Sequence, residues 1–356
     1  MPEGNRTDDQ QRGPVSAPLL EVRDLSVNIQ SEDGVVHAVD HVSWSVNRGE
    51  VLGIVGESGS GKSVSCLSLV GLLPEKRTTV TGSAVFDGVD LLECSEEQLD
   101  AIRGGQIAMI FQDPLSSLHP LMSVGAQLLE AIKLHQKMAK AAAKALAIEM
   151  LGRVGIPDPA RRMNAYPHEL SGGMRQRVMI AMALINDPAV LVADEATTAL
   201  DVTTQAQILD LLRDLCARAN SAIVLITHDL GVVAEVCDHV VVMYAGRVAE
   251  SGTVEAVLER PSHPYTWGLL GSMPSVDAKA ARARTIGGTP PSLLNPPSGC
   301  RFHPRCPHAM EVCRAEVPPL HHAPDGDGTH LTACHLDEAR LRVGAEGASV
   351  LSTVQW

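Results

Sequence analysis

The first part of the chain alternates between hydrophobic and polar positions. The segments "LLEVRDLSVNI" and "AVDHVSWSV", both within residues 19–55, show this alternation, which predicts an antiparallel β region. The segment "EVLGIVG" is instead a short hydrophobic run, which predicts a buried strand. A glycine-rich turn follows this strand and leads into the hydrophobic stretch "SVSCLSLVGLL", which we predict to be a helix.

The middle of the chain carries a different pattern. Residues 123–184 show mainly helical spacing, including an Ala/Lys-rich stretch at 136–148. The segments "AVLVADE" and "SAIVLITHD" are continuous hydrophobic runs, typical of parallel strands that are covered on both faces. The segment "HVVVMYAGRVAESG" predicts a terminal β-hairpin. Together these elements predict an α/β fold.

Composition changes along the chain and suggests its division into parts. Residues 1–18 are polar, with glycine and proline and no periodicity, which predicts a disordered tail. After Arg260 the sequence becomes rich in Pro, Gly and His. We therefore expect a main domain at 19–260, an extension at 261–340 and a tail at 341–356. No internal repeat is visible, so the chain carries one copy of the main domain.

Net charge and aromatic content narrow the classes of function. The formal net charge of −13 and an aromatic content of 3% argue against a nucleic-acid partner, which needs basic surfaces and stacking side chains. No hydrophobic run reaches the roughly 20 residues that span a bilayer. The start of the sequence has no hydrophobic segment of the kind found in secretory signals. We therefore expect a protein made and kept in the cytosol.

The segment "GESGSGKS" predicts a phosphate-binding loop between a strand and a helix. Backbone N–H groups of such a loop surround phosphate oxygens, and the helix N-terminus favours an anion. Lys62 would reach the β- and γ-phosphates, and the Ser63 hydroxyl would bind Mg²⁺. The remaining cofactor-binding candidates of the loop are Gly56, Ser58, Gly59, Ser60 and Gly61.

The strand "VLVADE" ends in two acids, one a candidate Mg²⁺ ligand and the other a candidate catalytic base. Asp194 is placed to hold Mg²⁺, directly or through water. Glu195 is placed to accept a proton from an attacking water molecule. The alternative is a solvated acidic pair, but the phosphate loop upstream favours the catalytic interpretation.

The segment "LSGGMRQR", Leu170 to Arg177, resembles the signature sequence of the ATP-binding-cassette (ABC) ATPases. Other motifs follow the order of that family: "FQDP" with Gln112, "TALD" ending at Asp201, and "ITHD" with His228. The resemblance covers roughly residues 19–260. It implies an ABC-type P-loop fold, with a RecA-like core, an antiparallel β subdomain and a helical signature subdomain.

The resemblance also implies roles for single residues. Ser171, Gly172 and Gly173 would face the γ-phosphate of an ATP molecule held by a second ATPase subunit. Gln112 would sense Mg²⁺ or the attacking water and link the site to a transmembrane partner. His228 would contact the γ-phosphate and position the water.

Two further points concern the edges of this site. Asp201 would bridge to the opposing subunit. The family usually stacks adenine on an aromatic residue upstream of the phosphate loop, and this sequence has none between Leu25 and Val36. Ile29 and His37 are the nearest substitutes, whereas Trp44 lies in an alternating strand and is expected in the core.

Motifs that occur in fewer families indicate which kind of transporter this ATPase belongs to. The segments "FQDPLSSLHPLMSVG", "HPYTWGLLGSMP" and "PPSGCRFHPRC" resemble the ATPases of dipeptide and oligopeptide importers. Nickel importers and some sugar or opine importers share part of this pattern. The resemblance implies two transmembrane permease subunits, an extracytoplasmic peptide-binding protein, a heterodimer with a related ATPase, and a peripheral location on the cytoplasmic face of the membrane.

Four cysteines cluster in the extension, at Cys300, Cys306, Cys313 and Cys334. In a reducing compartment such clusters are more often metal ligands than disulfides. In some members of the subfamily these positions bind a [4Fe–4S] cluster, and four thiolates are its usual ligands. Zinc, or no metal, are the alternatives, although the tight cysteine pairs of structural zinc sites are missing.

Two competing functions remain from the sequence. A soluble ABC ATPase that acts on ribosomes or DNA would usually carry two cassettes or a long coiled coil, and this chain has neither. A catalytically weak subunit would bind ATP while its partner hydrolyses it. Because Glu195, His228 and the signature are all present, we expect an active subunit.

Overall fold

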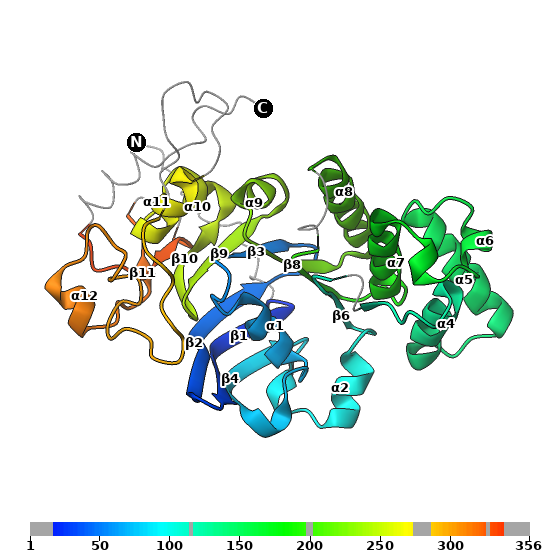
Figure 1. Ribbon diagram of the computed structural model, residues 1–356, viewed down its shortest axis with the longest axis horizontal. Helices are drawn as coiled ribbons and strands as arrows, with labels where there is room; N and C mark the ends of the chain where they lie inside the picture. Colours follow the sequence, from blue (N-terminus) through cyan, green and yellow to red (C-terminus); the bar gives the residue numbers. More distant parts are fainter. Residues whose placement is uncertain (1–16, 114–116, 197–201, 273–285, 325–327, 338–356) are drawn as a thin grey trace, which may run out of the picture.

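The computed structural model describes residues 17–113, 117–196, 202–272, 286–324 and 328–337. Its two sheets lie at the centre, a helical lobe lies to one side, and the C-terminal extension lies to the other (Figure 1). The predicted tail at 341–356, and all but the last two residues of the predicted tail at 1–18, fall outside the described residues. Within the described ranges, no helix is long and hydrophobic enough to cross a membrane.

The first sheet is antiparallel and has the strand order β2-β1-β4-β5. Its strands are Leu20–Ser31 (β1), Gly34–Val46 (β2), Thr78–Phe86 (β4) and Val89–Asp90 (β5). In β2, Val42, Trp44 and Val46 are buried while the serines between them are exposed. The predicted antiparallel region is therefore confirmed, and Trp44 is a core residue.

The second sheet has the order β11-β12-β10-β9-β3-β8-β7-β6 and is parallel from β9 to β6. Its central strands are Val51–Val55 (β3), Ile107–Ile110 (β6), Val190–Asp194 (β7), Ala222–Thr227 (β8) and His239–Tyr244 (β9). Every residue of β7 and β8 is buried, as the continuous hydrophobic runs predict.

The helices are Lys62–Leu69 (α1), Glu96–Ile102 (α2), Val124–His135 (α4), Lys140–Arg153 (α5), Pro159–Arg162 (α6), Gly172–Leu184 (α7), Val202–Ala219 (α8), Leu230–Val236 (α9), Val254–Glu259 (α10), Pro264–Gly271 (α11) and Glu311–Ala315 (α12). Short 3₁₀ turns lie at Glu75–Arg77 (η1), Leu91–Glu93 (η2) and Pro167–Glu169 (η3). The prediction that α1 continues to residue 73 is wrong. The helix ends at Leu69 because Gly71 has a left-handed backbone, with φ 62°.

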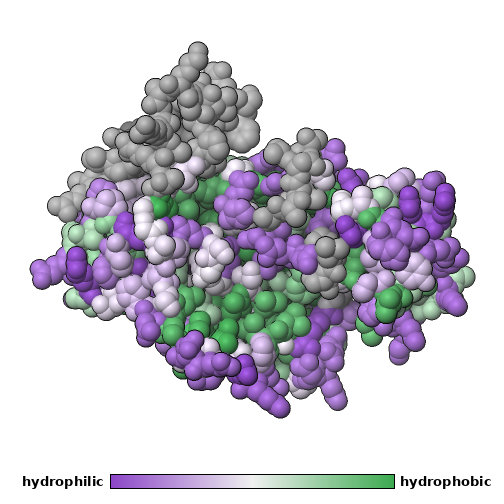
Figure 2. All heavy atoms as spheres, viewed as in Figure 1, coloured by the Kyte–Doolittle hydropathy of each residue, from purple (hydrophilic) through white to green (hydrophobic). Residues whose placement is uncertain are grey.

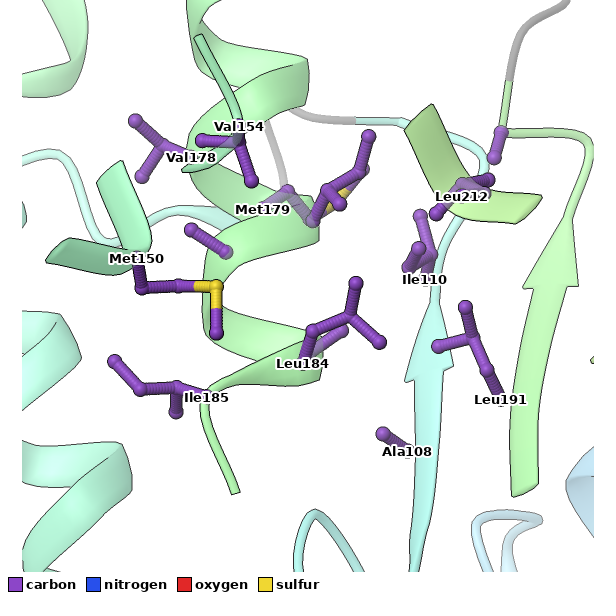
Figure 3. Packing of buried hydrophobic residues seen from close by; sticks show 14 of the residues in the cluster. Ala108, Ile110, Met150, Val154, Val178, Met179, Leu184, Ile185, Leu191 and Leu212 are labelled. Carbon is purple, nitrogen blue, oxygen red and sulfur yellow. The ribbon is translucent and has the colours of Figure 1, made fainter. Parts of the chain in front are cut away.

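The helical lobe shares one hydrophobic core with the parallel sheet. Met150 of α5, Val154 directly after that helix, and Val178 and Met179 of α7 are buried, and they belong to one cluster that reaches Ile110 of β6 (Figure 3). This packing fixes α7 against the parallel sheet. The signature residues at the start of α7 therefore have a defined place relative to the rest of the chain.

The extension continues the second sheet. Leu331–Thr332 (β12) pairs antiparallel with Glu250 and Ser251 of β10, which spans Arg247–Thr253, and His321–His322 (β11) adds one more strand. The hairpin of β9 and β10 is therefore not terminal, because β12 takes up the hydrogen-bonding edge of β10. The predicted boundary near residue 260 stays a prediction.

The surface on one side is mostly hydrophilic. Hydrophobic residues gather at its lower centre, over the region that α1 and the first sheet occupy in Figure 1 (Figure 2). Exposed large hydrophobic side chains among the described residues include Leu72, just after α1, and Val35 and Val89 of the first sheet.

Candidate active site

The phosphate loop connects β3 to α1 and depends on its glycines. A side chain at Gly56 would place its Cβ 2.1 Å from the Met243 carbonyl oxygen, and one at Gly61 would lie 2.3 Å from the Ala38 carbonyl oxygen. Both glycines also have positive φ values, 153° and 95°. No other residue fits these two positions without moving the backbone.

Lys62 is the first residue of α1 and is held over the loop. Its ammonium group donates to the carbonyl oxygens of Gly56 at 2.8 Å and Glu57 at 3.0 Å. Burial lowers the pKa of Lys62, while the carboxylates of Glu195 and Asp194 act in the opposite direction. The cation therefore lies among the loop's backbone and the two candidate catalytic acids.

Ser63 and Asp194 form the candidate Mg²⁺ site. The Ser63 hydroxyl donates to the Asp194 carboxylate at 2.8 Å, and the Asp194 side chain is largely buried at the end of β7. Burial raises the pKa of Asp194, against the hydrogen bond from Ser63. Two adjacent oxygen ligands fit Mg²⁺, which usually takes only one or two from the protein and the rest from phosphates and water.

Glu195, Gln112 and His228 come together beside the loop. Gln112 follows β6 and donates its amide to the Glu195 carboxylate at 2.8 Å. His228 follows β8, and its Nδ1 lies 3.5 Å from the other Glu195 oxygen. Because β6, β7 and β8 are parallel neighbours, their carboxyl ends meet at one edge of the sheet.

These residues line one open cavity of about 730 Å³. Its walls are the phosphate loop, Gln112, Glu195 and His228, together with Leu269, Ser272 and Ile286 from beyond residue 260. Ser58, Gly59 and Ser60 are among the loop residues that line it. The cavity suits a phosphate ester, whose terminal phosphate would lie beside the Glu195 carboxylate.

The signature residues are not part of this cavity. Ser171 caps α7, with its hydroxyl accepting from the Met174 N–H at 3.3 Å, and Ser171 and Gly172 are exposed. Gly172 and Gly173 are not among the residues that line the phosphate-loop cavity. Within one chain, the signature residues therefore do not contribute to the phosphate-loop cavity. Asp201 lies outside the described residues.

The adenine position lacks an aromatic side chain among the predicted candidates. Ile29 pairs with Val36 across β1 and β2 and is half-buried. The His37 ring bonds to Asn28 at 2.7 Å, and the His37 backbone N–H donates to the Leu293 carbonyl oxygen at 2.9 Å. The extension therefore contacts the strand that would lie next to adenine.

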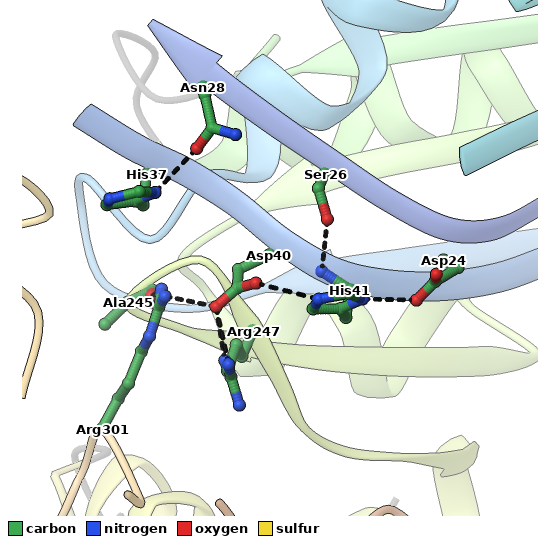
Figure 4. Close-up of polar contacts among 9 residues, drawn as sticks. All are labelled: Asp24, Ser26, Asn28, His37, Asp40, His41, Ala245, Arg247 and Arg301. Carbon is green, nitrogen blue, oxygen red and sulfur yellow. Dashed lines mark hydrogen bonds and ion pairs between the residues drawn. The ribbon is translucent and has the colours of Figure 1, made fainter. Parts of the chain in front are cut away.

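A second contact joins the extension to both sheets. Asp40 of β2 accepts from Arg247 of β10 at 2.7 Å and from Arg301 of the extension, which also donates to the Ala245 carbonyl oxygen (Figure 4). Burial raises the pKa of Asp40, but Arg247 and Arg301 outweigh it and hold that pKa below its usual value. The carboxylate is thus ionised between two guanidinium groups.

The four cysteines of the extension lie within electrostatic reach of one another. Burial is the main cause that raises the pKa of Cys334 to about 12, and Cys300, Cys306 and Cys313 raise it further. Within the described ranges, however, no group of three or more His, Cys, Asp or Glu is arranged to hold a metal ion. The predicted iron–sulfur site therefore has nearby thiols but not a formed ligand set.

Comparison with known proteins identifies the family. Residues 39–198 match the family model described as ABC transporter, and residues 249–313 match that of the oligopeptide/dipeptide transporter C-terminal region. The chain is 54% identical to the oligopeptide transport ATP-binding protein OppD of Salmonella typhimurium over 302 residues, covering 85% of this chain and 90% of the relative. The chain belongs to the ABC transporter family. The predicted family, ABC fold and ATPase class are confirmed.

Other similarities agree with this assignment. The dipeptide transport ATP-binding protein DppD of Escherichia coli is 49% identical over 323 residues, covering 90% of this chain and 98% of the relative. Among solved structures, a dimeric post-hydrolysis state of the ATP-binding cassette MJ0796 bound to ADP and Pi matches with a TM-score of 0.59 and 26% identity. That match covers 66% of this chain and 98% of the other. The roles of single site residues stay predictions.

Sequence reasoning missed the polar contacts that join the extension to the ATPase core. Asp40 and Arg301 are 261 residues apart in sequence, and Glu57 and Arg305 are 248 apart. No periodicity or spacing connects such pairs. The available signal was the presence of arginines in a segment rich in Pro, Gly and His.

Proposed function

We propose that this ABC ATPase hydrolyses ATP to drive the import of dipeptides or oligopeptides. The observation that carries the catalytic part is the single cavity where the phosphate loop meets Gln112, Glu195 and His228. The substrate class is supported by the printed functions of the relatives, OppD and DppD, and by the matching C-terminal region. Import of nickel or another small solute by the same motor is the alternative.

The chain's own residues divide the chemistry. Lys62 and the loop N–H groups bind the β- and γ-phosphates, and Ser63 and Asp194 would hold Mg²⁺. When bound, Mg²⁺ neutralises charge on the phosphates. Glu195 accepts the proton of the attacking water, because its carboxylate is oriented by the Gln112 amide. His228, on the other Glu195 oxygen, orients the same carboxylate and the water.

A second ATPase subunit completes the site. Ser171, Gly172 and Gly173 do not line the phosphate-loop cavity of their own chain, which supports a role for them on ATP bound by another subunit. Their helix N-terminus supplies N–H groups and a favourable potential for the γ-phosphate. By analogy with the peptide importers we favour a related but different ATPase as that partner.

A hydrophobic groove beside the site fits the membrane partners. Leu72, Phe111 and Leu134 line a cavity of about 310 Å³ between α1 and the helical lobe, and these three side chains are exposed. Phe111 is adjacent to Gln112, which contacts Glu195. A short amphipathic segment of a permease subunit in this groove would be coupled to the catalytic carboxylate. This arrangement corresponds to a peripheral subunit on the cytoplasmic face of the membrane, with an extracytoplasmic binding protein delivering the peptide.

The transporter assembled with its co-purifying permease subunits is expected to couple hydrolysis to peptide. In liposomes, ATPase activity should rise several-fold when a binding protein loaded with a tripeptide is present, because substrate delivery favours the closed ATPase dimer. The measurement is phosphate release together with uptake of labelled peptide. If nickel instead of peptide stimulates the ATPase activity and is taken up, the substrate assignment would be replaced, but the proposed ATP hydrolysis would stand.

We also propose that the four extension cysteines bind a [4Fe–4S] cluster. The support is their mutual proximity and the number of thiols, although binding must draw the four side chains into a ligand set. A cluster would brace a segment that has little hydrophobic core of its own. Zinc is the alternative metal.

Anaerobic purification tests this site. We expect about four iron and four sulfide ions per chain, with visible absorbance, because four thiolates are the usual ligands of this cluster. Cys306→Ser should lose them, whereas Cys94→Ser should keep them, because Cys94 is a half-buried cysteine whose thiol donates to the Asp90 carbonyl oxygen. One zinc ion per chain would show that the site binds zinc instead of a cluster. Absence of metal from freshly purified protein would refute the site.

A further inference from the structure

The phosphate loop contains one acidic residue, and the extension neutralises it. Glu57 is the only acid in "GESGSGKS". Its side chain is 24% exposed, and Glu57 is one of the residues that line the phosphate cavity. Its charge reaches Lys62, where it acts to raise the lysine pKa against burial. An unpaired carboxylate at this point would oppose the binding of an anionic ligand.

Arg305 of the extension pairs with this carboxylate through both of its terminal nitrogens. Nη1 donates to one Glu57 oxygen at 2.6 Å and Nη2 donates to the other at 3.0 Å. The Arg305 side chain is only 6% exposed. A two-pronged, nearly buried pair of this kind fixes the orientation of the carboxylate as well as its charge.

All five N–H groups of Arg305 have acceptors. Besides the two bonds to Glu57, Nε donates to the Gly287 carbonyl oxygen at 2.9 Å, Nη2 to the Ile286 carbonyl oxygen at 3.4 Å, and Nη1 to the Tyr244 hydroxyl at 3.2 Å. The guanidinium also lies over the Tyr244 ring, 5.7 Å from its centre. Apart from Glu57, the arginine is therefore held by residues of the extension and of β9.

A second contact holds the backbone of the same loop residue. The Glu57 N–H donates to the hydroxyl of Tyr265 at 2.9 Å, and Tyr265 is fully buried in α11. The Glu57 carbonyl oxygen in turn accepts from Lys62. Main chain and side chain of Glu57 are thus both fixed by residues from beyond position 260.

We propose that Arg305 is a positioning residue for ATP binding: by pairing with Glu57 it fixes that carboxylate in one orientation and cancels its charge beside the phosphate loop. The extension is then part of the nucleotide site of its own subunit. This inference rests on the proposed ATP-binding role of the loop. It assigns to the C-terminal segment a direct effect on nucleotide affinity, independent of any metal.

The test compares Arg305→Met with a rescue variant. We expect Arg305→Met to raise the Kd of the full chain for a non-hydrolysable Mg-ATP analogue about tenfold, since it leaves Glu57 charged and unpaired. Adding Glu57→Gln should restore the Kd to within about threefold of the original value. A loss that came only from a loosened extension would not be rescued, because Glu57→Gln restores no contact.

Three controls make the outcome decisive. Glu57→Gln alone should bind at least as tightly as the unmodified chain, and it decides the question if Arg305→Met does not fold. Arg305→Lys keeps the charge and should lose less affinity than Arg305→Met. Arg301→Met removes another buried arginine of the extension, but its partner Asp40 still pairs with Arg247. This variant should keep the Kd within about threefold of that of the unmodified chain.

The results separate the two proposals. Equal losses for Arg301→Met and Arg305→Met, or a double variant as weak as Arg305→Met, would overturn the role of Arg305. Failure of the unmodified chain to bind the analogue would instead contradict the proposed ATP site. In the assembled transporter, Arg305→Met should raise the KM for ATP and leave kcat nearly constant, as expected when the substitution weakens the binding of substrate and transition state equally.

Discussion

Glu195→Gln is expected to abolish ATP turnover while Mg-ATP stays bound. The substitution keeps the shape of the side chain and its hydrogen bond from Gln112, but the amide cannot accept a proton from water. General-base catalysis typically contributes on the order of 10²–10⁴-fold, so turnover in the assembled transporter should fall by that factor. Phosphate release and retention of labelled ATP on the purified complex measure the two effects.

An exposed acid provides the control for this experiment. Glu259→Gln at the end of α10 makes the same chemical change on the surface and should leave turnover unchanged. Persistent turnover in Glu195→Gln would mean that another group accepts the proton. Low turnover in the unmodified subunit, with full activity in its partner, would identify this chain as the catalytically weak member of the pair.

The candidate active site could be predicted from sequence because its parts are local. The phosphate loop is one strand, one turn and one helix, and its glycines are required by contacts of 2.1 Å and 2.3 Å that any side chain would make. Gln112, Glu195 and His228 each follow a short hydrophobic strand. Since those strands are parallel neighbours, the residues after them meet at one edge without further information.

The missing predictions depend on contacts between distant segments. The hydrophobic pattern continues past Gly71 and so predicts too long a helix α1, because the pattern carries no sign of the left-handed backbone at Gly71. The pairing of β12 with β10, and of Arg305 with Glu57, depend on how the extension folds back over the ATPase core. A two-residue strand and a single arginine carry no pattern that predicts their partners.

The extension therefore changes how the ATP site should be understood. Its residues line the phosphate cavity, contact the loop through Glu57 and reach β2 through Leu293 and Arg301. A family comparison separates the two regions, whereas the physical contacts join them. Changes at the contacts with Glu57 should consequently appear as changes in nucleotide affinity, and not only in stability.

Gly172→Asp is expected to abolish turnover without weakening the folded chain. A Cβ at Gly172 meets nothing within 4 Å, and the residue is exposed at the first turn of α7. An aspartate there is favourable for the isolated helix, by about 0.3–1 kcal/mol, because it lies at the positive end of the helix dipole. The thermal midpoint of the purified subunit should therefore stay the same or rise slightly.

The same charge is unfavourable once a second subunit brings ATP to the signature. The aspartate would then face the γ-phosphate, replacing a favourable anion site by a repulsive one, and turnover should fall by about 10²-fold or more. Gly172→Asn, which has nearly the same size without the charge, is the matched control and should lose much less. Binding of a Mg-ATP analogue by the single chain should be unchanged in both, since its phosphate loop is untouched. Equal turnover in the aspartate and asparagine variants would show that the signature does not approach phosphate, and the two-subunit site would have to be abandoned.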